Sequence, residues 1–188
     1  MEPGLEPELA VATLRVADAR NAPGARTTEA YEQLSGELHG FLIRTVRDPE
    51  AAADLLADAF TRLFVEEGAG RWPDQPRGWL YRVATNLAMS RGRHLQVVAR
   101  VTQVLQGRYS EPRDTSPDVE VLRRERRSEL DQALDRLSAD ARTALLLAAQ
   151  GFDGRAVSVA IGRSELATRA LLCRSRVRLR EILREGEA

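Results

Sequence analysis

Apolar residues recur three or four positions apart along the first third of the chain, which is the spacing of one face of an α-helix. The first such stretch predicts a helix over residues 28–46, with Thr28 as its N-cap. The expected buried stripe of this helix is Tyr31, Leu34, Leu38, Phe41 and Leu42.

A second helix is predicted directly afterwards, because Asp48, Pro49 and Glu50 form a start signal. Aspartate suits the N-cap, proline suits the first turn, and a carboxylate there complements the helix dipole. The apolar positions that follow are Leu55, Leu56, Ala59, Phe60, Leu63 and Phe64, and the opposite face carries Asp54, Asp58, Thr61 and Arg62.

Glycines and prolines over residues 66–77 predict a loop, after which the helical pattern resumes. We expect the resulting third helix to pack with the first two as one bundle, followed by a further helical piece over residues 95–105. Its predicted core stripe is Trp79, Leu80, Val83, Ala84, Leu87 and Ala88, and its polar face carries Arg82, Asn86, Ser90, Arg91 and Arg93.

The second half of the chain repeats the helical pattern after a break. Residues 107–118 hold two prolines and a glycine among polar residues, which predicts a flexible linker. Leu130, Leu134 and Leu137 mark one helix beyond it, Ser138 caps another that ends at Gly151, and helices over 153–161 and 164–183 follow. The predicted fold is all-α, with small domains at 28–106 and 119–188 and a loose extension at 1–27.

Charge is unevenly distributed, although 28 arginines balance 28 acidic residues and there is no lysine. Residues 1–60 hold 5 Arg against 11 acidic residues, whereas residues 61–110 hold 8 against 3. Residues 111–142 hold 7 against 9, and residues 143–188 hold 8 against 5. Two basic blocks favour two phosphate-facing surfaces, although ordinary surface charge would produce the same pattern.

Several classes of protein do not fit the sequence. No apolar run approaches the roughly 20 residues of a membrane span, and the acidic N-terminus has no signal-peptide pattern. The single Cys173 cannot form an intramolecular disulfide, so we expect a cytoplasmic protein without membrane insertion. His39 and His94 lack partners at metal-ligand spacing. We therefore expect no catalytic residues, no metal and no cofactor.

The strongest local motif is a short helix over residues 153–161, Gly162, and a second helix that Ser164 caps. This order is typical of a helix-turn-helix, whose second helix offers its N-terminal residues to base edges in the major groove. Further basic residues along that helix suit phosphates, although an antiparallel helix pair with a solvated basic end would fit as well. The residues concerned are Ser164, Glu165, Thr168 and Arg169 near its start, followed by Arg174, Arg176, Arg178 and Arg180.

Three further motifs extend this pattern over residues 28–184. The second helix reads Asp-Leu-Leu-Ala-Asp-Ala-Phe at 54–60, and the third reads Trp-Leu-Tyr-Arg-Val-Ala-Thr-Asn-Leu-Ala at 79–88. The second domain has Leu137-Ser138 through Arg142 and then a leucine run at 145–147. In this order and spacing the chain resembles the extracytoplasmic-function (ECF) sigma factors of bacterial RNA polymerase.

The resemblance implies partners and roles for the matched positions. Residues 28–106 would be a region-2-like domain and residues 119–188 a region-4-like domain, with the linker threading toward the polymerase cleft and RNA exit path. It also implies contacts with the β′ clamp helices and β flap of core RNA polymerase, with promoter DNA, and with an anti-sigma protein. The implied sites are Asp54, Asp58 and Arg62 for the clamp; Trp72, Arg82, Asn86, Arg91 and Arg93 for the −10 element; and Ser164, Glu165, Thr168, Arg169, Arg174 and Arg176 for the −35 element.

The chain departs from the family pattern at several positions. Ala156 stands where glutamate is usual, and Ala170 and Leu171 stand where polar or basic residues are usual. Thr168 occupies the place of a buried valine, and residues 89–92 replace the usual Ile-Asp-Tyr-Leu. These departures leave two alternatives open: a degenerate sigma paralogue that binds polymerase without reading promoters, and a helix-turn-helix regulator that binds duplex DNA alone.

Overall fold

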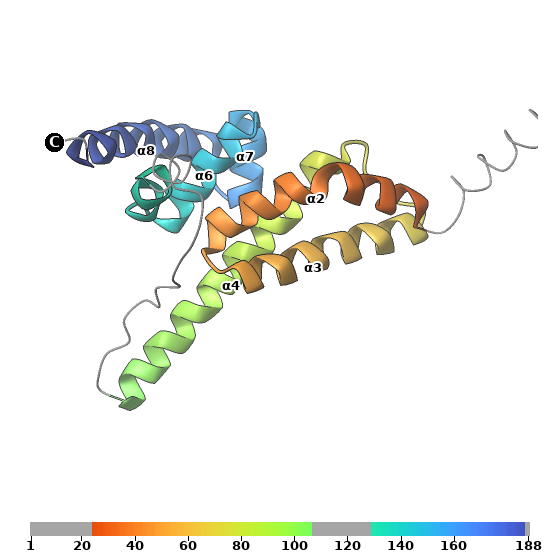
Figure 1. The fold of residues 1–188 in the computed structure, drawn as a ribbon, viewed down its shortest axis with the longest axis horizontal. Coiled ribbons are helices and arrows are strands. Elements are labelled where there is room, and N and C mark those ends of the chain that lie inside the picture. Colours follow the sequence, from red (N-terminus) through yellow and green to blue (C-terminus); the bar gives the residue numbers. More distant parts are fainter. Residues whose placement is uncertain (1–23, 107–128, 187–188) are drawn as a thin grey trace, which may run out of the picture.

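The computed structural model describes residues 24–106 and 129–186, with side chains described as far as residue 95 in the first range. All regular structure in these two ranges is helical, which confirms the predicted all-α fold (Figure 1). The predicted extension at 1–27 lies almost wholly outside the described residues, and the linker at 107–118 lies wholly outside them. The labelled helices are α2 (Ala25–Val46), α3 (Pro49–Gly68), α4 (Pro76–Gln106), α6 (Ala139–Ala149), α7 (Gly154–Ile161) and α8 (Glu165–Gly186).

The start of α2 differs from the prediction, because a side chain distant in sequence caps it. Glu67 of α3 accepts hydrogen bonds from the backbone N–H groups of Arg26 and Thr27, each at 3.0 Å, and from the Thr27 hydroxyl at 2.6 Å. The helix therefore begins at Ala25, after Gly24 in a left-handed conformation. Thr28 is not the N-cap, and its hydroxyl instead donates to the Gly24 carbonyl oxygen.

Helix α3 begins where the sequence predicts. Asp48 is its N-cap and accepts from the backbone N–H of Ala51 at 3.1 Å. The helix continues to Gly68, into the segment predicted as a loop. Two predicted core aromatics are half-exposed, since Tyr31 of α2 and Phe64 of α3 each expose 49% of their surface. Tyr31 still contacts the edge of the Phe60 ring at a centroid distance of 4.9 Å.

Helix α4 is one continuous helix that joins the predicted third helix to the predicted piece over 95–105. Its N-terminal half packs against α2 and α3, and its C-terminal half projects away from the other helices (Figure 1). The bundle core is apolar and well packed. Fully or almost fully buried there are Leu38, Phe41, Leu42, Leu63, Leu80, Tyr81 and Ala84.

In the second group of helices, each labelled helix begins at an N-cap residue that lies next to it in the sequence. Residues 129–135 are helical, and Ser138, Asp153 and Ser164 then cap α6, α7 and α8 through their side-chain oxygens. Gly162 ends α7 with φ of 68°, a left-handed conformation that a glycine adopts without strain. The predicted helix–glycine–helix unit is therefore confirmed as α7, Gly162 and α8.

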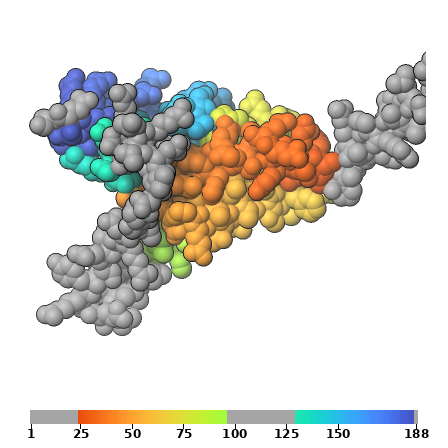
Figure 2. Space-filling model, viewed as in Figure 1, coloured from red at the N-terminus to blue at the C-terminus, as the bar shows by residue number. Residues whose placement is uncertain are grey.

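The two groups of helices share one continuous core. Helix α6 packs against α2, helix α7 packs against α4, and the buried apolar residues of both groups form a single cluster. Figure 2 shows the α6–α8 group seated against one end of the α2–α3 layer. The two-domain division predicted from the sequence remains a prediction, since the described residues on either side of the break pack directly together.

Candidate nucleic-acid and protein interfaces

One face of α3 is acidic and open to solvent. Asp54 and Asp58 lie four residues apart on it, Arg62 follows one turn later, and all three are exposed. None of them forms an ion pair with a described residue. Because the opposite face of α3 buries Leu55, Ala59 and Leu63, the acidic face is the part of this helix left for a partner.

A basic face lies along α4. Arg82, Asn86 and Arg93 are exposed at spacings of four and seven residues, which places them on one side of the helix. Arg91 is also exposed and lies 3.7 Å from the Asp48 carboxylate, which partly neutralises it. This face offers cations and an amide to an anionic ligand.

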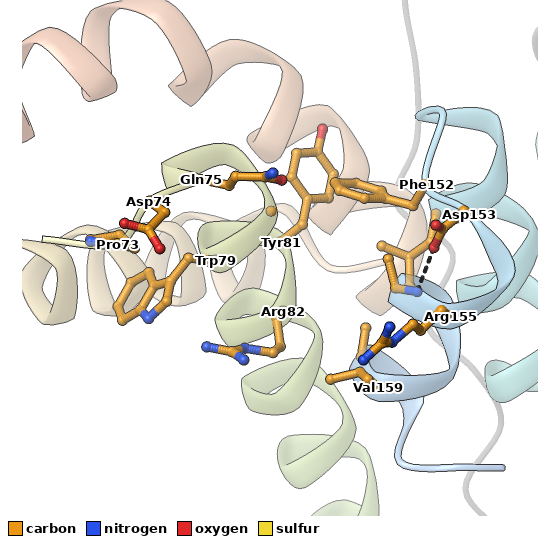
Figure 3. Close-up of a pocket in the computed structure, with 14 residues that line it drawn as sticks. Pro73, Asp74, Gln75, Trp79, Tyr81, Arg82, Phe152, Asp153, Arg155 and Val159 are labelled. Carbon is orange, nitrogen blue, oxygen red and sulfur yellow. Dashed lines mark hydrogen bonds between the residues drawn. The ribbon is translucent and has the colours of Figure 1, made fainter. Parts of the chain in front are cut away.

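Trp79 packs against the core, as predicted, and also belongs to the α4 face. It is partly exposed and lies three residues before Arg82, so that Trp79, Arg82 and Asn86 share one side of α4. Figure 3 shows Trp79 and Arg82 at a cleft of about 610 Å³ between α4 and α7, with Arg155 and Val159 on the opposite wall. The apolar spacing that suggested a core residue also fits an aromatic at the rim.

Trp72 lies in a different groove from Arg82. The guanidinium of Arg26 stacks over its ring at 4.2 Å from the centroid, a cation–π contact. Glu29 and Gln33 of α2 line the same groove beside the first turn of α4. The structure therefore does not bring Trp72 together with the other predicted −10 residues.

The start of α8 presents its predicted residues to solvent, with one exception. Ser164 accepts from the backbone N–H of Ala167 at 3.2 Å, and Glu165 and Arg169 are exposed in the first two turns. Thr168 is completely buried, so its prediction as a DNA contact is wrong. It takes the inward position that packs α8 on α6 and α7, and its hydroxyl has no partner among the described residues.

Arginines continue along the exposed side of α8. Arg169, Arg174 and Arg176 are exposed and form no ion pair with a described residue. Cys173 is also exposed, and it lines a groove with Arg169 and Arg176 between α8 and the start of α7. The described part of the chain contains no group of His, Cys, Asp and Glu that could hold a metal ion.

The seam between the two groups of helices is built around Arg77. Its guanidinium donates to Glu37 at 2.8 Å and to the backbone carbonyl oxygen of Gln150 at 3.1 Å. It also lies about 5 Å from the ring centroids of both Tyr81 and Phe152. The hydrogen bond to Glu37 raises the pKa of Arg77, so this arginine keeps its charge at the seam.

Tyr81 and Phe152 complete the seam, with ring centroids 4.9 Å apart (Figure 3). Burial, with the nearby Glu37 carboxylate, raises the pKa of Tyr81 to about 12. Tyr81 is 1% exposed, which places it in the core. Phe152 was not predicted to have a role, because its contacts join segments some 70 residues apart.

Among the described helices, none is long and apolar enough to cross a membrane.

Comparison with known proteins gives consistent matches of three kinds. Residues 30–97 match the family model of sigma-70 region 2. RNA polymerase sigma-H factor of Pseudomonas aeruginosa is 31% identical over 115 residues, covering 57% of this chain, and the match spans 60% of that relative's length.

The third match is a solved structure, the sigma factor RpoE of Bartonella quintana in complex with the anti-sigma factor NepR. It shares the fold with a TM-score of 0.64 at 23% identity, covering 84% of this chain and 96% of that one. The region 2 match contains the acidic face of α3 and the basic face of α4. Residues 30–97 therefore match the sigma-70 region 2 family, and the chain shares the fold of a solved sigma factor.

Proposed function

We propose that this chain binds core RNA polymerase and directs it to promoter DNA, without catalysing a reaction of its own. The observation that carries this proposal lies within the region 2 match. There α3 and α4 bury their apolar sides against each other and α2, and turn one acidic face and one basic face to solvent.

The acidic face of α3 is the proposed polymerase contact. Asp54 and Asp58 have no ion-pair partner among the described residues. A basic partner helix could therefore pair with these carboxylates without displacing an ion pair within the chain. Complementary charge of this kind raises the rate of association and selects the partner. The basic clamp helices of the β′ subunit would supply such a partner, and the β flap would bind the α6–α8 group.

The basic face of α4 is the proposed contact with the −10 element. Capture of single-stranded DNA needs cations for the backbone and aromatic surfaces on which bases stack. Arg82, Asn86, Arg91 and Arg93 supply the polar part of this face. Trp79, at the rim of the same face, is the aromatic best placed beside them, and Trp72 offers a second aromatic surface once Arg26 leaves its ring.

Helix α8 is the proposed reader of the −35 element. Its exposed first turns would enter the major groove, and Arg174 and Arg176 would bind the flanking phosphates. The two promoter elements are centred about 25 base pairs apart, which corresponds to about 85 Å along a duplex. Since α7 packs directly against α4, the α6–α8 group would have to separate from the bundle before both elements could be bound.

We further propose a cytoplasmic location and regulation by an anti-sigma protein. The Bartonella quintana sigma factor of the same fold was solved with such a partner. Co-purification from the native host under non-inducing conditions tests this part of the proposal. Recovery of the chain free and active under all conditions would contradict it.

Reconstitution with core polymerase tests the main proposal. Asp58→Lys should weaken polymerase binding by roughly tenfold, whereas Glu32→Lys, the same charge change on the exposed side of α2, should not. Run-off transcription from a native genomic library then gives the promoters. A chain that neither binds core polymerase nor supports promoter-dependent transcription would contradict the proposal.

The same system separates the alternatives. Asn86→Ala should reduce strand opening at the −10 element while leaving polymerase binding intact, because Asn86 is exposed on α4 and does not belong to the acidic face of α3. Polymerase binding without any promoter preference would favour the degenerate paralogue. Binding of the free chain to a palindromic duplex, without polymerase, would favour a helix-turn-helix regulator.

A further inference from the structure

Leu166 is the most exposed of the large apolar residues in the described ranges, with 78% of its surface accessible. It is the second residue of α8, directly after Glu165 and the N-cap Ser164. The other leucines of α8 are buried or partly buried against the core. A leucine in this place contributes little to packing within the chain.

The neighbours of Leu166 define what the start of α8 can offer to a ligand. Ala170 is exposed one turn further on, so the two side chains form a small apolar patch on one side of the helix. Arg169 is exposed beside this patch, and Thr168 is buried. The exposed side chains of the first two turns therefore include one acid, one arginine and two apolar groups, namely Glu165, Arg169, Leu166 and Ala170.

These side chains correspond to different features of a duplex. In the major groove, arginine matches guanine, a carboxylate matches the amino group of cytosine, and an apolar side chain matches the methyl group of thymine. The thymine methyl is the only apolar feature that base edges display there. We propose that Leu166, supported by Ala170, packs against the methyl group of a thymine in the −35 duplex and so sets part of the promoter sequence.

This inference rests on the proposed function, because it requires α8 to enter the major groove. Surrounding charge favours DNA over a protein as the occupant, since Arg169, Arg174 and Arg176 are exposed on the same helix without ion-pair partners among the described residues. A protein partner on the apolar patch is the alternative that the experiment must distinguish.

The test removes the methyl group without changing anything else. The −35 sequence selected by polymerase carrying the full chain is first determined, and each of its thymines is then replaced in turn by deoxyuridine, which lacks only the methyl. At one position we expect the wild-type holoenzyme to lose about three- to fivefold in affinity, as the loss of one buried methyl group predicts. With Leu166→Ala, the same replacement should have no effect.

Val177→Ala serves as the matched control, since Val177 is 48% exposed on the same helix but three turns further on. Polymerase carrying this variant should still distinguish thymine from deoxyuridine as the wild type does. Equal unfolding midpoints for all three proteins would show that the loss is not one of folding.

Three outcomes overturn the inference while leaving the proposed function intact. They are a selected −35 element without thymine, a wild-type holoenzyme insensitive to every methyl removal, and a Leu166→Ala holoenzyme as sensitive as the wild type. Loss of core polymerase binding by Leu166→Ala, together with a wild-type holoenzyme that is insensitive to methyl removal, would assign the patch to a protein instead. Failure to select any promoter would instead contradict the proposed function, and the inference with it.

Discussion

Arg142 of α6 donates a hydrogen bond to the backbone carbonyl oxygen of Thr45 in the last turn of α2, at 3.0 Å. The arginine is 8% exposed, and its guanidinium also lies 3.8 Å from the Asp135 carboxylate. Burial lowers the pKa of Arg142, with the positive charge of Arg47 nearby as a further cause. A residue that the sequence placed in a family motif therefore joins the two groups of helices.

Arg142→Met should lower the free energy of unfolding by about 1–2 kcal/mol, because the buried Thr45 carbonyl oxygen loses a hydrogen bond from a charged donor. Methionine keeps most of the apolar stem, so the loss reports on the guanidinium. Urea unfolding measures it. Arg136→Met, which removes an exposed ion pair with Glu185, is the control and should change the free energy by less than about 0.5 kcal/mol. Equal effects of the two variants would contradict the assignment.

Glu67 should make stability depend on pH at the acid end. Burial acts to raise the pKa of Glu67, but hydrogen bonds from Thr27 and the backbone N–H groups of Arg26 and Thr27 outweigh it, so the pKa falls below its usual 4.5. A carboxylate with a lowered pKa stabilises the fold above the unfolded-state pKa, and this contribution is lost as the pH falls through the lower, folded-state value.

Glu67→Ala should therefore cost about 1 kcal/mol at neutral pH, the usual effect of losing a helix cap. The difference from the wild type should shrink below about pH 4.5, where the unfolded chain begins to bind the proton. Unfolding by urea at a series of pH values measures it. Glu66→Ala, which removes the exposed neighbour paired with Arg71, is the control. A difference that grows as the pH falls would reverse the assigned sign.

Tyr81 should make stability depend on pH at the alkaline end. Its pKa is raised from 10.0 to about 12, so the unfolded chain loses the phenolic proton before the folded chain does. Stability from this group is complete below the unfolded-state pKa and is lost as the pH rises through the folded-state value. Tyr81→Phe should therefore lose less stability than the wild type between pH 9 and about pH 11.

Tyr31→Phe provides the comparison for Tyr81, because Tyr31 is half-exposed. Absorbance of the ionised phenol, followed together with unfolding, measures both variants. If Tyr81→Phe loses as much stability with rising pH as the wild type, Tyr81 is not the group responsible.

Local signals explain the parts of the fold that the sequence predicts well. Asp48, Ser138, Asp153 and Ser164 each cap a helix through a backbone N–H three residues away, so the start of that helix can be read from neighbouring residues. The start of α2 could not be read in this way. Its cap is Glu67, some 40 residues along the chain, and only the packing of α3 on α2 brings the two together.

The same distinction between local signals and tertiary packing applies to the candidate surfaces. Helical periodicity placed Asp54, Asp58, Arg82 and Asn86 on open faces, and the structure has them exposed. Periodicity could not separate the rim from the core for Trp79, nor predict the stacking of Tyr81 on Phe152, because both depend on the docking of α7 against α4. Periodicity also did not predict that Leu166 is exposed, because the buried side of α8 must be known before an exposed leucine can be recognised.

Thr168 should hold the proposed DNA-reading helix α8 in place rather than contact DNA itself. Its side chain is fully buried and its hydroxyl has no hydrogen-bond partner among the described residues. A buried hydroxyl without a partner costs free energy, and valine has nearly the same shape without that group. Thr168→Val should therefore raise the free energy of unfolding by about 0.5–1.5 kcal/mol and leave promoter binding unchanged.

Thr143→Val is the matched control for this substitution. Thr143 is also buried, with 1% exposure, but its hydroxyl donates to the Ala139 carbonyl oxygen at 2.7 Å. The same change there removes a made hydrogen bond and should lower the free energy of unfolding by about 1 kcal/mol. Urea unfolding and promoter binding with core polymerase, measured on both variants, decide the matter. Weaker promoter binding by a stably folded Thr168→Val variant would return Thr168 to the DNA-contacting surface, because its hydroxyl would then have its partner on the duplex.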